Sequence, residues 1–168
     1  MKHERSSREA PGTTVLDAID KAIILALQTD GRISYASLAA KVGLSQAAAR
    51  QRVNKLIESG VMEVVAITDP LKLGFHVQAD LGINVSGDPR PVVAALEAFP
   101  EVEYLRYTAG RFEIMAEVLF PTSEQLHEFV NGRLREVPGV DRVETMIVLE
   151  RVKETHDWGI PERERDGD

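Results

Sequence analysis

The side chains with the clearest chemistry lie on a predicted helix that starts after Ser45 and runs to about Ser59. Ser45 is a favourable N-cap, because its hydroxyl can accept a hydrogen bond from the first helical turn. At about 100° per residue, one arc of this helix is apolar and holds Ala49, Val53, Leu56 and Ile57. The opposite arc is small and polar, with Ala47, Ala48, Gln51, Asn54 and Lys55, and it is flanked by Arg50 and Arg52.

The small and polar arc suits the major groove of DNA. Alanine methyl groups allow close approach and contact thymine, amides read base edges, and arginines reach phosphates. The backbone N–H groups of a helix N-terminus also bind phosphate. We therefore predict DNA contacts from Ser34, Ser45, Gln46, Ala47, Ala48, Arg50, Gln51, Arg52, Asn54 and Lys55. The alternative is that these side chains only solvate an exposed helix face, and the sequence leaves open which of them touches a base.

Three helices must position this arc. Residues 16–28 have apolar side chains at spacings of three and four, with Asp17 and Asp20 as N-cap and first-turn anion. Ser34 then caps a short second helix that a glycine ends. Helices joined by tight glycine-containing turns are typical of a helix-turn-helix, whose last helix enters the groove. Residues 15–60 are therefore predicted to form a DNA-binding domain.

A second domain is predicted after a strand over Val61 to Ile67 and a linker that reaches residue 75. Apolar and polar residues then alternate, which is the period of a strand with one buried face. The predicted elements are strand 77–85, helix 89–99, strands 101–108 and 112–120, a helix from its cap Ser123 to Glu136, and strand 140–152. The order is β-α-β-β-α-β, and the similarity of residues 96–105 to residues 134–143 indicates two related halves.

Two such halves predict an α+β fold of the ferredoxin-like type, in which both helices cover one face of an antiparallel sheet. The other face then needs a cover, and pairing with a second copy of the chain is the simplest expectation. A crossing by one of the chain's termini is the alternative. We assign residues 76–154 to this domain and residues 61–75 to a hinge strand and linker. Residues 1–14 are predicted to be a loose arm, and residues 155–168 a C-terminal tail.

Composition excludes several classes of protein. The chain has 168 residues, 43% of them hydrophobic, a net charge of −7 and no cysteine, so disulfides, Cys-ligated zinc and thiol nucleophiles are excluded. The four histidines lack metal-ligand spacing, and no catalytic triad or P-loop is present, so neither a metal site nor an enzyme is expected. The longest apolar stretch has six residues, far below the ~20 of a membrane span, so a cytoplasmic location is expected.

The charge is divided unevenly along the chain. Residues 1–69 hold nine Lys and Arg against eight Asp and Glu, a net of +1, which leaves 11 basic and 19 acidic residues in 70–168, a net of −8. The first part can therefore approach a polyanion, whereas the second part favours other partners.

Six short phrases of the sequence form a specific pattern. They are Leu16-Asp17-x-Ile19-Asp20, Asp30-Gly31-Arg32-x-Ser34, Leu38-Ala39-x-x-Val42-Gly43-Leu44-Ser45, Arg52-Val53-x-x-Leu56, Gly60-Val61 and Asp69-Pro70-x-x-Leu73-Gly74. Together they resemble the Lrp/AsnC family of bacterial and archaeal transcriptional regulators, also called feast/famine regulatory proteins. The resemblance covers residues 16 to about 154.

The resemblance implies a helix-turn-helix (winged-helix-like) domain followed by a RAM domain, named for the regulation of amino-acid metabolism. It implies a sequence-specific DNA-binding transcriptional regulator whose RAM domain dimerises and often assembles into tetramers or octamers. Its implied partners are double-stranded DNA, further copies of itself, and an amino acid or related small metabolite as effector. No other cofactor is expected.

In this family the effector pocket lies around the turn between the second and third RAM strands, where a Gly-x-x-Asp pattern recurs. The resemblance therefore implies effector contacts from Thr108, Ala109, Gly110, Arg111, Phe112, Glu113 and Thr145. Glu113 stands where Asp is usual, which moves the carboxylate by about 1.5 Å. The structural alternative is that Gly110 only supplies a turn, while Glu113 pairs with Arg111 or Arg106.

Two other functions stay open on the sequence. An effector-independent architectural DNA binder would share the N-terminal features, and the Glu113 departure favours it. A metabolite-binding RAM protein with little DNA affinity is disfavoured, because it would not need the polar set on the 45–59 helix.

Overall fold

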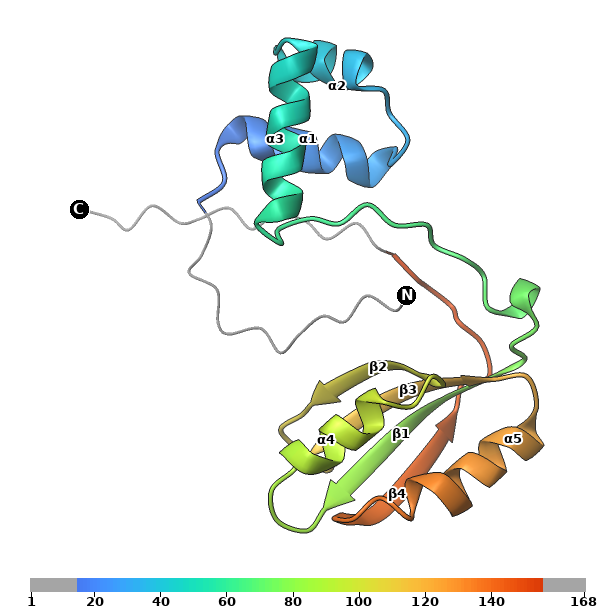
Figure 1. Ribbon diagram of the computed structural model, residues 1–168. Helices are drawn as coiled ribbons and strands as arrows, with labels where there is room; N and C mark the ends of the chain where they lie inside the picture. Colours follow the sequence, from blue (N-terminus) through green and yellow to red (C-terminus); the bar gives the residue numbers. More distant parts are fainter. Residues whose placement is uncertain (1–14, 156–168) are drawn as a thin grey trace. The chain divides into compact units, whose positions relative to one another are not determined.

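The computed structural model describes residues 15–155, so the predicted arm 1–14 and all but the first residue of the predicted tail lie outside the described residues. The chain divides into two compact units: residues 15–66 belong to the first together with residues 154–155, and the second spans Ile67–Lys153 (Figure 1).

The first unit consists of α1 (Ala18–Thr29), α2 (Tyr35–Val42) and α3 (Gln46–Glu58). Each helix begins at the predicted cap: Asp17, Ser34 and Ser45 accept hydrogen bonds from the backbone N–H three residues on. A left-handed glycine at φ 70° ends α2 and permits the tight turn into α3. One core joins the helices, formed by Ile23 and Ile24 of α1, Leu38 of α2, and Val53 and Leu56 of α3.

The prediction of a strand over Val61 to Ile67 is wrong for the single chain. Residues 61–69 form no strand, and Val64, Val65 and Ile67 are 53%, 60% and 60% exposed. A strand is stable only beside a hydrogen-bonded neighbour, and no described segment pairs with these residues. The β-branched side chains of Val64, Val65 and Ile67 therefore lie outside any strand of the described part of the chain.

The second unit confirms the β-α-β-β-α-β order. Its elements are β1 (Val77–Val85), α4 (Arg90–Glu97), β2 (Val102–Tyr107), β3 (Ile114–Phe120), α5 (Ser123–Glu128) with a π-helical turn at Phe129–Leu134, and β4 (Val140–Ile147). The strands lie in the order β2-β3-β1-β4, and all neighbours are antiparallel. This is the ferredoxin-like sandwich that the sequence predicts.

Both helices of this unit pack on the same face of the sheet (Figure 1). Leu81 and Ile83 of β1 are fully buried in one cluster with Leu96 of α4, and with Phe129 and Leu134 after α5. Because side chains alternate across a strand, Asp80 and Gly82 must face the other side. No described element covers that side, as the sequence analysis expected.

Two predicted boundaries in this unit need correction. Thr122, not Ser123, is the cap of α5: its hydroxyl accepts from the backbone N–H of Gln125 at 3.4 Å, and Ser123 is the first helical residue. The last strand ends at Ile147, well before the predicted 152. Val148 donates one more hydrogen bond, to the Gln78 carbonyl oxygen, and β1 begins at the residue before Gln78, so later residues have no strand to pair with.

Candidate nucleic-acid interface and ligand site

Helix α3 has the two-sided character that a groove-binding helix requires. Ala49, Val53 and Leu56 are at most 4% exposed and fasten the helix to its unit. The predicted DNA-contacting residues lie on its other faces or at helix starts. Of these, Ser34, Ser45, Gln46, Ala47, Arg50, Gln51, Asn54 and Lys55 are exposed, whereas Ala48 and Arg52 are partly buried.

Tyr35 is a neighbour of this surface that the sequence analysis missed. The Arg50 guanidinium lies over the Tyr35 ring, 5.9 Å from its centroid, so the first residue of α2 supports a side chain of α3. The position of Tyr35 directly after the cap of α2 was visible in the sequence. The contact was not, because it depends on how α2 and α3 cross.

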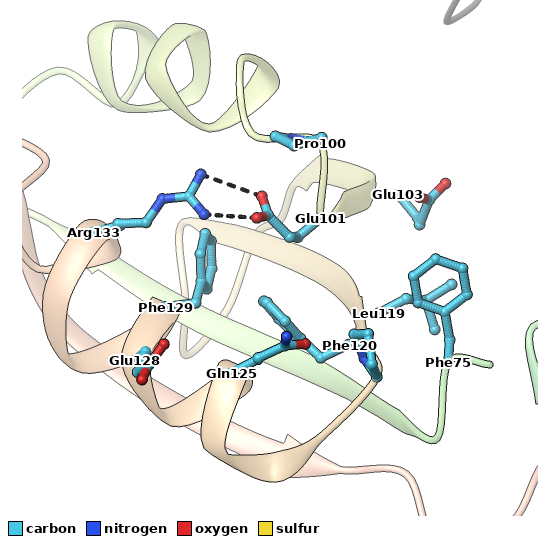
Figure 2. Close-up of a pocket in the computed structure, with 11 residues that line it drawn as sticks. Phe75, Pro100, Glu101, Glu103, Leu119, Phe120, Gln125, Glu128, Phe129 and Arg133 are labelled. Atoms are coloured by element: carbon cyan, nitrogen blue, oxygen red, sulfur yellow. Dashed lines mark hydrogen bonds and ion pairs between the residues drawn. The ribbon is translucent and has the colours of Figure 1, made fainter.

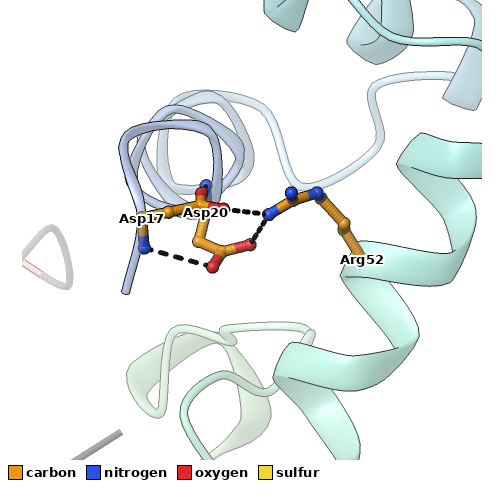
Figure 3. Close-up of polar contacts among 3 residues, drawn as sticks. All are labelled: Asp17, Asp20 and Arg52. Carbon is orange, nitrogen blue, oxygen red and sulfur yellow. Dashed lines mark hydrogen bonds and ion pairs between the residues drawn. The ribbon is translucent and has the colours of Figure 1, made fainter. Parts of the chain in front are cut away.

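Arg52 is engaged inside the unit, which revises its predicted role. Its terminal nitrogen Nη1 lies 2.6 Å from a carboxylate oxygen of Asp17 and 2.8 Å from one of Asp20 (Figure 3). The backbone N–H of Asp20 and then the Arg52 guanidinium hold the pKa of Asp17 below its usual value. A guanidinium that already binds two carboxylates is a poorer phosphate ligand than one without such partners.

The turn between β2 and β3 holds the predicted effector residues in a hydrogen-bonded loop. The Thr108 hydroxyl donates to the Phe112 carbonyl at 2.7 Å, and the Thr108 N–H donates to the Glu113 carbonyl at 3.0 Å. Gly110 adopts φ 156° and lies with Ala109 at the exposed tip. The loop is thus closed on itself by backbone and hydroxyl contacts.

The Glu113 carboxylate has partners that the sequence analysis did not expect. One of its oxygens accepts from the Asn84 amide at 3.0 Å and from the Val85 N–H at 3.2 Å. These two donors hold the pKa of Glu113 below its ordinary value, so the side chain stays ionised at neutral pH. The structural alternative, in which Glu113 pairs with Arg111 or Arg106, is therefore wrong in its choice of partner.

The two arginines pair elsewhere. Arg111 reaches across to Glu144 of β4 at 2.6 Å, while Arg106 lies 4.0 Å from Glu117. Cross-strand geometry explains the choice: Arg106 and Glu117 come from neighbouring strands, whereas Glu113 points toward the end of β1.

Phe112 lies over Gly82 on the face of the sheet that the helices leave open. A Cβ atom on Gly82 would come within 2.5 Å of the Phe112 ring, so the ring occupies the space that a side chain would fill. Arg111 lies over the same ring at 5.3 Å from its centroid. A lone glycine in an alternating strand can signal such close approach, and Gly82 was not singled out for it.

Thr145, the last of the predicted effector residues, does not lie beside the turn between β2 and β3. It lies directly opposite Leu81 in the register of β1 and β4, and directly opposed residues share a sheet face. It therefore belongs to the helix side, whereas Gly82 and Phe112 lie on the other side. Its neighbour Glu144, opposite Gly82, occupies the turn side instead.

A separate hollow of about 410 Å³ lies between α5 and the ends of β2 and β3 (Figure 2). Phe75, Leu119 and Phe129 contribute apolar surface, and Arg133 forms paired contacts of 2.6 and 3.3 Å with Glu101. None of the predicted effector residues lines it. Across the described residues, every buried side-chain nitrogen or oxygen has a hydrogen-bond partner, so no such atom points into the hollow unpaired.

Comparison with known proteins bears directly on both sites. The AsnC-type helix-turn-helix domain family matches residues 16–57, and the Lrp/AsnC ligand binding domain family matches residues 78–158. The HTH-type transcriptional regulator FL11 of Pyrococcus horikoshii is 35% identical over 142 residues, which cover 83% of this chain and 93% of that protein. The chain belongs to the Lrp/AsnC family of transcriptional regulators.

Solved structures of Lrp/AsnC proteins share the architecture. The structure of AsnC from E. coli aligns with a TM-score of 0.78 at 27% identity, covering 85% of this chain and 98% of that one. The leucine response regulatory protein LrpA of Mycobacterium tuberculosis aligns with a TM-score of 0.77 at 28% identity, covering 85% and 99%. The chain is thus a transcriptional regulator with a DNA-binding helix-turn-helix and a ligand-binding domain. No described helix is long and apolar enough to cross a membrane.

The lowered pKa of Asp17 predicts how the first unit responds to acid. Because the folded-state pKa lies below the usual value near 3.8, this carboxylate adds stability at higher pH and loses that contribution as pH falls through the folded pKa. A carboxyl titration followed by NMR should give a midpoint below 3.8 for Asp17, and Arg52→Ala should raise that midpoint. A midpoint at or above 3.8 in the unaltered chain would contradict the contacts described for Asp17.

Proposed function

We propose that α3 is the recognition helix and that its exposed arc enters the major groove of operator DNA. The observation that carries this proposal is the pairing of a buried inner face with small and amide side chains on the outer face. Gln51 and Asn54 read base edges, while Ala47 and Ala48 allow the helix to lie close to the bases. A regulator of this kind binds chromosomal DNA in the cytoplasm. Its role requires DNA binding and no catalysis.

The charged and hydroxyl side chains around this arc contact the DNA backbone. Arg50, supported by the Tyr35 ring, and Lys55 bind phosphates. Ser34 and Ser45 lie at the starts of α2 and α3, where backbone N–H groups favour an anion. Gln46, exposed in the first turn of α3, contacts DNA beside this helix start.

Substitutions on α3 separate the two kinds of contact. Gln51→Ala should weaken binding to the preferred sequence about tenfold and leave binding to random DNA unchanged, because a lost base contact affects only the cognate site. Arg50→Ala should weaken binding to both DNAs and lower the salt slope by about one. Fluorescence anisotropy with DNA selected by the protein from a random library measures both effects. Unchanged binding in both variants would contradict the assignment of α3.

We further propose that the working form is a homodimer in which the open face of the RAM sheet packs against a second copy. Two observations support this partner: the helices cover only one sheet face, and the β-branched side chains of Val64, Val65 and Ile67 are exposed outside any strand. Exposed apolar side chains also continue past β4, with Leu149 96% and Val152 88% exposed. Tetramers or octamers would extend the same assembly.

The proposed effector is an amino acid or related small metabolite bound at the turn of residues 108–113, where a second copy completes the site. The matched ligand-binding domain and the name of the leucine response regulator from M. tuberculosis support this class. Within the turn, Glu113 is the ionised group that can receive an ammonium. One specific observation favours the alternative, an effector-independent architectural DNA binder: Asn84 and Val85 already occupy one oxygen of Glu113.

A thermal-shift screen against the twenty amino acids tests the effector. A compound that binds only the folded state at 100 times its Kd should add about 2.7 kcal/mol of stability. The shift should disappear in Glu113→Ala and persist in Glu136→Ala, which removes an exposed carboxylate from the same unit. If no compound shifts the unaltered protein and DNA binding is intact, the effector proposal is wrong and the architectural role is favoured.

A further inference from the structure

Asp17, Asp20 and Arg52 form a closed ring of polar contacts at the start of α1 (Figure 3). One oxygen of Asp17 accepts from the Asp20 N–H at 2.7 Å, and one oxygen of Asp20 accepts from the Asp17 N–H at 3.3 Å. The remaining oxygen of each carboxylate binds the same Arg52 nitrogen, at 2.6 and 2.8 Å. The cap of α1 and the ion pairs of α3 therefore share two carboxylates.

This ring adds a directional contact to packing that is otherwise apolar. Arg52 precedes the buried Val53 and follows Gln51, so it lies at the border between the inner face of α3 and the proposed base-reading face. The apolar contacts of α3, at Ala49, Val53 and Leu56, hold the helices together, but hydrophobic burial is non-directional. Two hydrogen-bonded ion pairs with fixed partners resist rotation, because the contacts are lost if the helix turns.

We propose that Arg52 is a positioning residue, whose contacts with Asp17 and Asp20 set the rotation of α3 and so determine which bases Gln51 and Asn54 reach. The inference rests on the proposed role of α3 as the recognition helix. It gives the acidic pair a role in DNA recognition, although neither carboxylate would touch DNA.

The competing role for Arg52 is direct phosphate binding, and the two roles predict opposite outcomes when the carboxylates lose their charge. If Arg52 binds phosphate, Asp17→Asn with Asp20→Asn frees the guanidinium, removes two negative charges and strengthens binding to every DNA. If Arg52 positions α3, the same change weakens binding to the preferred sequence and spares random DNA. Asn retains the capping ability of Asp, so the start of α1 is kept.

The experiment uses the full chain and DNA selected by the protein from a random library, with random DNA as the second probe. We expect the Asp17→Asn/Asp20→Asn variant to bind the selected DNA about tenfold more weakly, as loss of one base contact would. Arg52→Ala should do the same without changing the salt slope. A matched control, Asp30→Asn with Glu58→Gln, removes equal charge from the same unit away from Arg52 and should not weaken selected-site binding.

The outcomes separate failure of this inference from failure of the proposed function. If Gln51→Ala lowers affinity for the selected DNA, α3 reads DNA. In that case the positioning role is wrong if the double Asn variant strengthens binding to both DNAs. It is also wrong if Arg52→Ala lowers the salt slope by about one. If Gln51→Ala has no effect, the proposed function itself fails. Circular dichroism checks folding, and Asp20→Asn alone, which leaves the Asp17 cap, carries the test if the double variant unfolds.

Discussion

Packing of the inner face of α3 against α1 and α2 is the interaction on which the DNA-binding unit depends. Val53 and Leu56 lie in one core with Ile23 and Leu38, so the burial of a few aliphatic side chains holds all three helices. Because this inner face is narrow, Ala47, Gln51 and Asn54 on the outer face of α3 stay exposed. Packing of only one face of α3 thus both stabilises the unit and leaves the proposed base-reading side chains accessible to DNA.

A different constraint organises the RAM unit, namely the alternation of side chains across its sheet. Leu81 and Ile83 point into the helix-covered core, which forces Gly82 and Asp80 to the open face. Phe112 fills the space above Gly82, and the turn that carries Phe112 is also the turn that holds Glu113. The candidate effector turn and the proposed dimer face are therefore adjacent parts of one surface, which gives an effector a physical route to the assembly.

The sequence predicted correctly the features that depend on interactions between residues close together in the chain. The caps Asp17, Ser34 and Ser45 and the order of strands and helices follow from hydrogen-bonding side chains and from periodicity. The strand predictions were wrong where the presence or length of a strand depends on a neighbouring strand far away in the sequence. A strand over residues 61–67 needs a hydrogen-bonded neighbour, and no described segment supplies one. The last strand ends beside the first residues of β1, because later residues have no strand to pair with. At α5, two adjacent hydroxyl residues were both acceptable caps, and the sequence did not distinguish Thr122 from Ser123.

The candidate sites also combine features that the local sequence predicts with contacts that it does not predict. Which residues lie on the outer arc of α3 follows from helical period alone, whereas the pairing of Arg52 with Asp17 joins residues 35 positions apart. The partners of Glu113 likewise come from β1, 28 or more positions away. Such contacts depend on how helices cross and strands align, and neither is encoded in a local pattern.

The most direct test of the central claim, that α3 faces DNA, is a photo-crosslinking measurement. A photoreactive amino acid replaces Ala47, exposed on α3, or Glu136, exposed in the RAM unit, in separate preparations of the full chain. If α3 faces DNA, position 47 should crosslink to DNA that the protein has selected, and position 136 should not. Equal crosslinking from both positions, or crosslinking from position 136 alone, would contradict it.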